Sequence, residues 1–216
     1  MRILTISSVF PNQAQPLLGL FVWQRMRHVA RLAEVRVVAP IPWSPLDDLA
    51  RMLKPGFRPA IPGIDGIEGL ESVHPRFLCW PGLLKFADGA LCYQGVKRAV
   101  QRLHHETPFD LLDVHFAYPD GLAGMLLASK LGIPYCVTLR GTEVPYSRSP
   151  GRRWQMKKVL ARASRVIAVS SSLAEVAGEL GCPGDKISII PNGVETATFY
   201  PRPRPECRDK LGLGQD

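Results

Sequence analysis

Short β-branched segments alternate with longer segments of helical periodicity along most of the chain, and this alternation constrains the fold more than any other feature. Residues 2–9 form an apolar β-branched run, residues 19–32 place apolar side chains three and four positions apart, and residues 34–39 form a second β-branched run. A strand, a helix and a strand in this order form a βαβ unit, whose two strands are parallel. The pattern therefore predicts an α/β protein with a doubly wound parallel sheet.

The same alternation resumes after a long helix predicted over residues 83–105. The further predicted strands are 111–114, 134–139, 166–169 and 187–190, and the further predicted helices are 121–131, 152–163 and 173–180. Gly132 and Gly181 directly follow two of these helices, at a position where a left-handed C-cap favours glycine. Residues 40–81 differ, because prolines and glycines interrupt them. There the sequence predicts only a short amphipathic helix over 46–53 and a strand over 77–79 that returns to the sheet.

Composition narrows the class of protein. A length of 216 residues with 46% hydrophobic content is sufficient for one domain with a sizeable core. No apolar run reaches the roughly 18 residues that a membrane-spanning helix needs, and we expect a cytoplasmic protein. The five cysteines show no C-x-x-C pair, so we expect reduced thiols and no metal site. The net charge of +8 favours anionic partners, namely nucleic acid, an acidic membrane surface or a phosphorylated small molecule.

Polar residues follow the predicted strands, at the edge where open parallel sheets bind ligands. In chain order they are Gly19, then His115, Tyr118 and Asp120, then Arg140, Thr142 and Glu143, then Ser170, and finally Asn192 and Gly193. Loops are generally polar, but this explains less well a charged pair such as Arg140 and Glu143 directly at a strand end. We therefore expect His115, Arg140, Glu143 and Asn192 to line one rim of a ligand groove.

Several of these residues also have structural explanations, which the sequence leaves open. Gly19 opens a helix, either as part of a phosphate site or as an ordinary tight turn. Asp120 is equally a candidate cap of the helix that begins at Gly121. Ser172 with Glu175 three positions later fits a capping box. For His115 the sequence does not decide between a ligand-binding role and a hydrogen bond to nearby backbone.

The chain after residue 186 suggests the end of a domain. Residues 186–190 resemble a buried strand that stops at Pro191, and Asn192-Gly193 predicts a sharp turn because both residues tolerate positive φ. The Pro/Arg-rich run at 201–205 is typical of a stiff spacer. We expect residues 1–200 to form one domain and residues 201–216 to be a linker toward a further domain outside this chain.

An ordered set of motifs resembles the N-terminal domain of a family 4 glycosyltransferase, a retaining enzyme of the GT-B fold. The motifs are Gly19-x-Phe21-Val22 with Arg25, Glu34-Val35-x-Val37-Val38-Ala39-Pro40, His115-x-x-Tyr118-Pro119-Asp120-Gly121, Thr138-Leu139-Arg140-Gly141-Thr142-Glu143, Ile167-Ala168-Val169-Ser170-Ser171, and Ile190-Pro191-Asn192-Gly193-Val194-Glu195 with Phe199. Each motif alone has low specificity, but the set spans nearly the whole chain in the order of the family.

The resemblance implies two Rossmann-like domains that face each other across a cleft, with this chain as the acceptor-side half. It implies that an absent C-terminal domain holds most of the nucleotide-sugar donor and carries the paired glutamates of the family. The implied reaction moves a sugar from that donor to a glycan or lipid-linked acceptor with retention and without a metal, in surface polysaccharide biosynthesis. The resemblance also implies that this half alone is inactive.

The resemblance also suggests roles for individual residues. Arg140 stands where many relatives have a histidine beside the transferred sugar, and it is the candidate catalytic residue. Arginine cannot act as a base, because its pKa stays above about 12, but its fork can bind a phosphate or a carboxylate. We expect it to support the leaving diphosphate or to hold an anionic acceptor. Candidate acceptor-binding residues are His115, Tyr118, Asp120, Thr142, Glu143 and Asn192, and candidate cofactor-binding residues, which would contact the nucleotide-sugar co-substrate, are Gly19, Ser170 and Gly193.

Two surface features remain. Between residues 148 and 165 there are seven lysines and arginines and no acid, which predicts a solvated face or a surface attracted to anionic lipid. Apolar and basic residues interleave over 43–58, where they would add an interfacial anchor for peripheral contact with the membrane. The rival function is a non-enzymatic basic α/β domain that binds polyanions. No nucleic-acid-binding motif is visible, and we expect no nucleic-acid partner.

Overall fold

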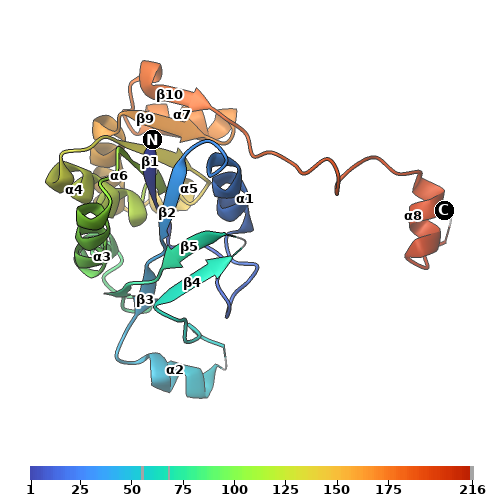
Figure 1. The fold of residues 1–216 in the computed structure, drawn as a ribbon, viewed down its shortest axis with the longest axis horizontal. Helices are drawn as coiled ribbons and strands as arrows, with labels where there is room; N and C mark the ends of the chain where they lie inside the picture. Colours follow the sequence, from blue (N-terminus) through green and yellow to red (C-terminus); the bar gives the residue numbers. More distant parts are fainter. Residues whose placement is uncertain (55, 68, 215–216) are drawn as a thin grey trace.

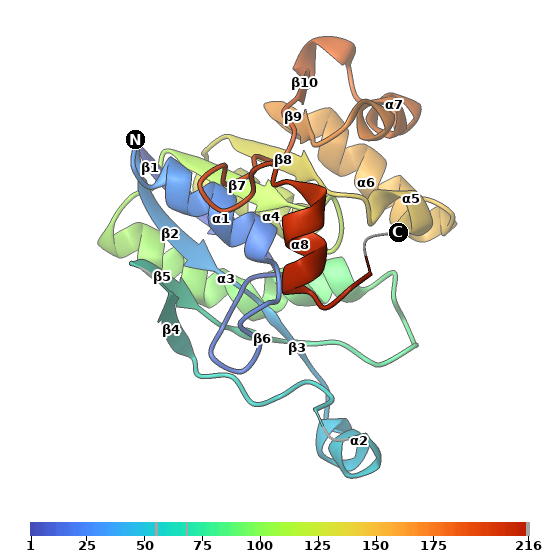
Figure 2. The ribbon, with the colours of Figure 1, turned by 90° about the vertical axis from the view of Figure 1, so that its right-hand side faces the viewer.

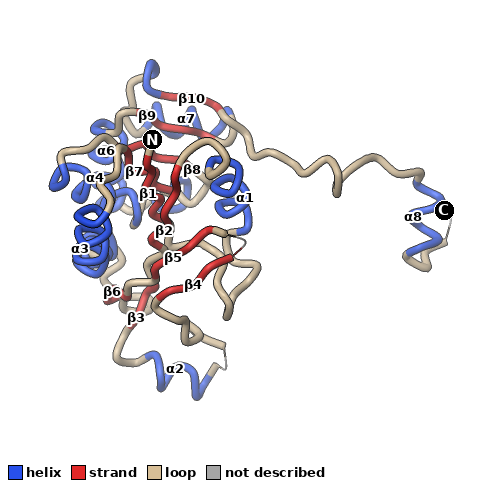
Figure 3. The backbone as a smooth tube through the Cα atoms, in the orientation of Figure 1, coloured by secondary structure: helices blue, strands red, loops and turns tan. Residues whose placement is uncertain are grey.

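The computed structural model describes residues 1–54, 56–67 and 69–214. Its centre is an eight-stranded sheet with helices on both faces (Figure 1, Figure 3). The strands are β1 (Arg2–Ile6), β2 (Glu34–Val38), β4 (Ile64–Ile67), β5 (Leu70–Val73), β7 (Leu111–His115), β8 (Tyr135–Leu139), β9 (Arg165–Ala168) and β10 (Ile187–Ile189). The predicted α/β fold with a doubly wound, Rossmann-like sheet is confirmed.

The strand order is β10-β9-β8-β7-β1-β2-β5-β4, and every pairing is parallel except that of β4 with β5. From β1 the chain first adds β2 on one side and later adds β7, β8, β9 and β10 on the other. The order therefore reverses between β1 and β7. The loops that follow the two strands at such a reversal run in opposite directions and leave a crevice between them at the carboxyl ends of the strands. Ligands bind in this crevice in folds of this kind.

The predicted helices are present, with boundaries shifted by a few residues. They are α1 (Leu20–Val29), α2 (Asp47–Leu53), α3 (Asp88–Glu106), α4 (Asp120–Leu131), α6 (Pro150–Arg162) and α7 (Ser171–Glu179); α5 (Glu143–Tyr146), α8 (Arg204–Lys210) and a 3₁₀ turn, η1 (Gly184–Lys186), were not predicted. Gly132 and Gly181 have φ of 69° and 82° just beyond α4 and α7, which confirms them as left-handed helix ends.

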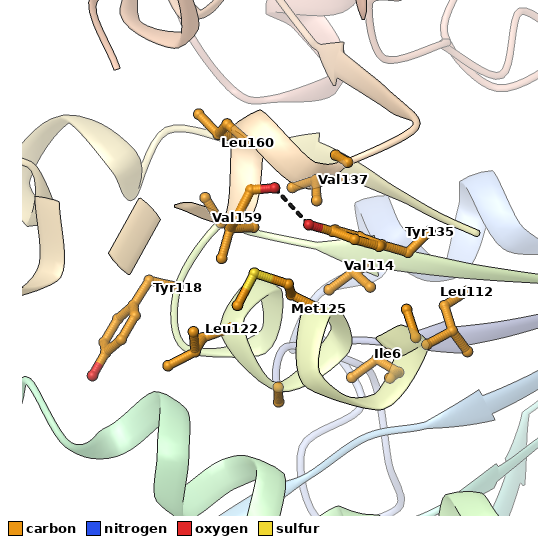
Figure 4. Packing of buried hydrophobic residues seen from close by; sticks show 14 of the residues in the cluster. Ile6, Leu112, Val114, Tyr118, Leu122, Met125, Tyr135, Val137, Val159 and Leu160 are labelled. Carbon is orange, nitrogen blue, oxygen red and sulfur yellow. Dashed lines mark hydrogen bonds between the residues drawn. The ribbon is translucent and has the colours of Figure 1, made fainter. Parts of the chain in front are cut away.

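Most of the core lies between the sheet and the helices α3, α4 and α6 (Figure 3). Figure 4 shows how Val114 and Val137 of the sheet pack against Met125 of α4 and Val159 of α6. The Tyr135 hydroxyl donates to the Val159 carbonyl at 2.6 Å, so this large ring is buried with its polar atom satisfied. The other face of the sheet is covered by α1 through a second, smaller cluster that includes Val22, Trp23 and Met26. Met156, Val159 and Leu160 of α6, with Ala163 just after it, are buried in the main core.

Residues 40–81 behave differently from the prediction. The predicted strand over 77–79 forms as β6 (Arg76–Leu78), but it pairs with β3 (Ile41–Trp43) in a separate two-stranded sheet and does not return to the main sheet. The hairpin of β4 and β5 extends the main sheet instead. The hairpin was not predicted from the sequence, because its strands are only four residues long and β4 contains a glycine, which weakens a strand pattern.

The end of the chain corrects two further predictions. β10 is an edge strand with Ile189 half exposed, so the expectation of a buried strand is wrong. Neither Asn192 nor Gly193 has positive φ, so the sharp turn predicted there does not form. The chain instead runs away from the sheet to α8 (Figure 1), which begins inside the proline-rich run that was expected to be only a spacer. The division into residues 1–200 and 201–216 stays a prediction.

Two absences apply to the described residues. No helix among them is long and apolar enough to cross a bilayer. All five cysteines lie in this part of the chain, and each is a free thiol.

Candidate functional site

Arg140, at the end of β8, is the centre of a hydrogen-bonded group at the carboxyl edge of the sheet. Its Nε donates to Nδ1 of His115 at 2.9 Å, and its Nη1 donates to Oδ1 of Asn192 at 2.9 Å. Its guanidinium lies over the ring of Phe21, 4.9 Å from the ring centre. Nη2 is covered and has no hydrogen-bond partner among the described residues. Burial, and then the charge of Arg25, lowers the pKa of Arg140 to about 10, so it remains a cation at neutral pH.

His115 is fully buried beneath this cation, at the end of β7. Because Nδ1 accepts the hydrogen bond from Arg140, the ring proton must lie on Nε2, which donates to Oδ2 of Asp113 at 3.2 Å. Burial, outweighing the attraction of Asp113, lowers the pKa of His115, which favours this neutral form. Both nitrogens are occupied, so His115 orients Arg140 and is not available as a base in this arrangement.

Asp113, on β7, is the buried carboxylate that accepts the hydrogen bond from His115. Burial raises the pKa of Asp113, but the hydrogen bonds from His115 and Cys136 and the positive charge of Arg25 outweigh burial, so this pKa lies below its ordinary value. Its carboxylate therefore remains ionised. The positive charges of Arg25 and Arg140 both act on this buried part of the sheet edge, Arg25 on Asp113 and Arg140 on Asp113 and Glu143.

Glu143 is fully buried and serves the backbone in this structure. Its carboxylate accepts hydrogen bonds from the backbone N–H groups of Ala117 at 2.9 Å, Arg140 at 3.2 Å and Gly141 at 2.8 Å. It thereby joins the loops that follow β7 and β8. Phe116, beside the first of these amides, has φ of 70°, a strained conformation for a residue with a side chain. The Glu143 clamp is one of the contacts that hold this turn in place.

Tyr118 and Asp120 also have internal partners. The Tyr118 hydroxyl donates to the Lys85 carbonyl at 2.5 Å and accepts from the Gly89 amide at 3.1 Å, and burial raises its pKa to about 12. One oxygen of Asp120 accepts from both the amide and the hydroxyl of Ser8, at 2.9 and 2.8 Å. Asp120 does not cap α4, so that alternative is wrong. Burial raises the pKa of the fully buried Asp120 to about 6.

Two other predicted residues, Gly19 and Ser170, are explained by local structure. Gly19 precedes α1 with φ of 69°, and a Cβ there would lie 2.3 Å from the Val9 carbonyl oxygen, so close backbone approach requires glycine. The Ser170 hydroxyl caps α7 by accepting from the Leu173 amide at 3.3 Å. Because α7 begins at Ser171, Glu175 is too far along the helix for the predicted capping box, which is wrong.

The remaining predicted residues differ in their surroundings. Thr142 precedes α5, and its Oγ1 is covered without a partner in the described chain. Gly193 is exposed, and a Cβ added there would meet no described heavy atom within 4 Å. Neither position has a local structural explanation.

The four rim residues named from the sequence do lie together around the ends of β7 and β8. Only Arg140 and Asn192 are accessible, however, whereas His115 and Glu143 are fully buried. The expectation that all four side chains line a groove is therefore corrected. The side chains of Arg140 and Asn192 reach the surface, whereas His115 and Glu143 lie beneath it and form hydrogen bonds to Arg140. The structure leaves untested whether His115, Tyr118, Asp120, Thr142, Glu143 and Asn192 bind an acceptor, and these roles stay predictions.

Two residues of α1, Phe21 and Arg25, also contribute to the site, although the sequence analysis quoted them only within a motif and gave them no role. Phe21 supports the Arg140 guanidinium, and Arg25 lies one helical turn later on the same face, with no hydrogen bond or ion pair to the described residues. Arg27 of the same helix pairs with Glu195 at 3.2 Å, which ties the segment after β10 to α1. The four-residue spacing of Phe21 and Arg25 was the available signal, but only the fold shows which strand they face.

A cavity of about 210 Å³ lies on the same edge, beyond the end of β2. Its wall is largely apolar, with prolines and isoleucines from 40–42 and 59–61, and its polar members include Asn12, Arg58 and His74. Nδ1 of His74 lies 3.2 Å from the Ala39 carbonyl, and burial lowers the pKa of His74. No sequence pattern indicated this cavity, because its residues lie in the loop after β1 and in the proline-rich stretch, and neither segment is periodic.

Comparison with known proteins agrees with the geometry. The family model for Glycosyltransferase Family 4 matches residues 18–198. TuaC of Bacillus subtilis (strain 168), a glycosyltransferase named for teichuronic acid biosynthesis, is 30% identical over 100% of this chain and 56% of its own length. A D-inositol 3-phosphate glycosyltransferase of Actinosynnema mirum is 29% identical over 59% of this chain and 33% of its own. The chain thus spans about half or less of the length of these relatives.

Solved structures share the fold. Sucrose-phosphate synthase from Thermosynechococcus elongatus superposes with a TM-score of 0.71 at 15% identity, covering 100% of this chain and 54% of its own. Alr3699/HepE of Anabaena, solved in complex with UDP-glucose, superposes with a TM-score of 0.59 at 17% identity, covering 98% of this chain and 50% of its own. Identities this low support the shared Rossmann-like GT-B fold and nothing finer.

Proposed function

The chain belongs to glycosyltransferase family 4, and from this premise we propose that it is the acceptor-side half of a sugar-transferring enzyme. In this proposal the donor is a nucleotide sugar, the acceptor is a glycan or a lipid-linked glycan, and the sugar is transferred with retention. A second Rossmann-like domain, outside this chain, supplies most of the donor site and closes the cleft. The length of the relatives supports this division, since the chain spans about half of TuaC.

The single observation that carries the proposal is the placement of Arg140. Its cation lies at the carboxyl end of β8, one strand from the reversal between β1 and β7, and is fixed by His115 from below and Asn192 from the side. When the bond between the sugar and the diphosphate breaks, negative charge develops on the departing phosphate oxygen. A fixed guanidinium in a partly buried position stabilises that charge more than water does.

We propose that the charge is balanced in this way without a metal ion, and that this chain supplies no base. Arg140 stays protonated, and both ring nitrogens of His115 are occupied. The proton of the attacking acceptor hydroxyl then passes to the oxygen of the leaving diphosphate. UDP-glucose in the solved complex of HepE supports a nucleotide-sugar donor for this chain.

The acceptor side of the proposal rests on the cavity beyond β2. A space of about 210 Å³ is of the size of a sugar ring, and its apolar wall with a few polar groups is typical of small-molecule sites. The name of TuaC supports a surface polysaccharide as the product. We propose a lipid-linked acceptor and peripheral contact with the inner face of the membrane.

The test is an assay of the complete polypeptide that contains this chain. It would be incubated with a panel of nucleotide sugars and with membrane lipid extract as acceptor, and release of nucleoside diphosphate would be measured. Arg140→Ala is expected to lower kcat by roughly 10²-fold or more. Arg98→Ala removes an exposed cation of α3 that has no hydrogen bond or ion pair to the described residues; it is the control and should be neutral. Equal rates for Arg140→Ala and wild type would overturn the proposal.

The chain by itself is expected to release no nucleoside diphosphate. A salt titration of filter binding to nucleic acid separates the rival function, in which the basic surface simply holds polyanions. Strong binding to nucleic acid together with no sugar transfer by the complete polypeptide would favour the rival.

A further inference from the structure

α2 presents apolar side chains to solvent on a projection from the body of the protein. It stands apart from the main sheet beyond the end of β3 (Figure 1, Figure 2), and its only buried side chain is Asp47. Leu49, Met52 and Leu53 are 57%, 81% and 84% exposed. Leu49 lies three and four positions before the other two, so all three share one region of the helix surface. A helix of a soluble domain normally turns such residues toward the core.

The base of α2 is firmly held, so this exposure is not that of a loose tail. Nη1 of Arg58 lies 3.1 Å from Oδ1 of Asp47 and 3.0 Å from the Cys79 carbonyl. The Ser44 hydroxyl donates to the same Asp47 oxygen at 2.6 Å. Arg51 donates from Nε and Nη2 to the Arg58 carbonyl at 3.0 and 2.6 Å. The network fixes the helix with its apolar side chains pointing away from the protein.

A second exposed apolar segment lies in the loop between β6 and α3. Leu83, Leu84 and Phe86 are each more than half exposed. The loop is joined to α6, since Nε2 of Gln155 donates to the Phe86 carbonyl at 2.7 Å. In Figure 2 this loop runs along the same side of the molecule as α2 and approaches α5 and α6.

α6 adds aromatic and basic groups beside this loop. Trp154 is exposed, and the ammonium of Lys158 lies 3.5 Å from the centre of its ring. Lys157 and Arg162 are exposed on the same helix, and the whole segment 148–165 contains no acid. On α2 the one exposed carboxylate, Asp48, is paired with Arg51. The surface thus combines protruding apolar side chains with unopposed cations.

We propose that α2, the loop of residues 83–86 and the exposed face of α6 together dock on an anionic lipid bilayer. Aliphatic and aromatic side chains enter the boundary between headgroups and acyl chains, while lysine and arginine bind the negative headgroups. A protein partner would need no surplus of cations, and nucleic acid would gain nothing from the leucines of α2. An anionic bilayer complements both the charge and the apolar protrusions, because it offers negative headgroups and an apolar interior side by side.

The proposal deepens the proposed function without depending on it for its test. The segment that carries α2 also walls the cavity, through Pro42, Arg58 and Pro59. Docking of α2 would therefore anchor one wall of the proposed acceptor site at the membrane surface. This suits an acceptor whose lipid stays in the bilayer while its sugar enters the cavity.

The experiment is cosedimentation of the chain with vesicles of phosphatidylcholine, with and without phosphatidylglycerol. Wild type is expected to bind the vesicles that contain phosphatidylglycerol, and to bind less as salt rises. The triple variant Leu49→Ser, Met52→Ser, Leu53→Ser is expected to lose about tenfold or more in partitioning. The matched control, Leu17→Ser with Leu32→Ser, removes exposed leucines elsewhere and should bind as wild type does.

A second variant tests the charges. Lys157→Gln with Lys158→Gln is expected to weaken binding to the anionic vesicles several-fold and to flatten its salt dependence. Thermal unfolding of every variant checks that the fold is retained. The proposal is overturned if wild type does not bind anionic vesicles, if the triple variant binds unchanged, or if the control variant loses as much as the triple variant.

The two proposals fail separately. Arg140→Ala should lower sugar transfer and leave vesicle binding intact, whereas the α2 triple variant should lose vesicle binding and retain transfer to a water-soluble acceptor. If the wild-type protein transfers sugar normally but does not bind vesicles, only the docking proposal is refuted. If the wild-type protein binds vesicles but the complete polypeptide transfers no sugar, only the proposed function is refuted.

Discussion

Nε of Arg140 lies 2.9 Å from Nδ1 of His115, so a neutral, buried histidine determines the direction of the cation at the edge of the sheet. The histidine is in turn fixed by Asp113, which accepts from its other nitrogen. This relay of carboxylate, imidazole and guanidinium turns a flexible side chain into an oriented positive charge, and such preorganisation is what stabilises charge in a transition state.

The first prediction concerns the fork of Arg140. Arg140→Lys keeps the positive charge but cannot reach His115, Asn192 and a substrate phosphate together, because an ammonium lacks the planar fork. We expect kcat of the complete enzyme to fall by about tenfold or more, with little change in thermal stability. Full activity of Arg140→Lys would show that a point charge suffices and that the relay is irrelevant to turnover.

The second prediction concerns the Glu143 clamp. Glu143→Gln places an NH₂ group among backbone amides that need an acceptor, so buried donors lose partners. Loss of such charge-assisted bonds should lower the free energy of unfolding by about 2–4 kcal/mol. Urea denaturation measures this. The control is Glu175→Gln on the exposed side of α7, which should change stability by less than about 0.5 kcal/mol. Equal stability of the two variants would refute the clamp.

The third prediction concerns pH and Asp120. Burial raises its pKa from 3.8 to about 6, so the folded protein binds a proton there more readily than the unfolded chain does. The contribution of Asp120 to stability is therefore present in full below pH 4 and declines as pH rises to about 6, by roughly 2–3 kcal/mol. Asp120→Asn keeps an acceptor for Ser8 and does not titrate, so this decline should disappear.

The measurement for Asp120 is urea denaturation at several pH values between 4 and 7. Asp185→Asn, which removes an exposed carboxylate, is the control and should keep the wild-type profile. If Asp120→Asn and wild type give parallel profiles, the carboxyl does not titrate in this window and the prediction is wrong.

The fourth prediction compares two glycines. Gly19→Ala requires a Cβ within 2.3 Å of the Val9 carbonyl oxygen and a positive φ, so we expect a loss of more than about 2 kcal/mol. Gly178→Ala lies inside α7 with no heavy atom within 4 Å of the new Cβ, and it should stabilise the protein by about 0.5–1 kcal/mol. Thermal unfolding distinguishes them, and the same sign for both would contradict the structural account of Gly19.

The sequence by itself determined the periodic parts of this protein. The alternation of β-branched and helical segments was sufficient to predict the parallel sheet, the helices and the edge where Arg140 and Asn192 lie, because hydrophobic period and strand direction are local properties of the chain. The motifs in order were sufficient to predict the family.

Only the tertiary structure decided which polar residues face a ligand and which are enclosed. His115 and Glu143 look alike in sequence to Arg140, since all three follow or end strands as polar residues. In the fold the Arg140 guanidinium lies on the buried His115, and the loops after β7 and β8 enclose Glu143, whereas Arg140 itself stays partly accessible. The same is true of the hairpin β4–β5 and of the exposed face of α2. Burial depends on which distant segments pack together, and a linear pattern of residue types does not contain that information.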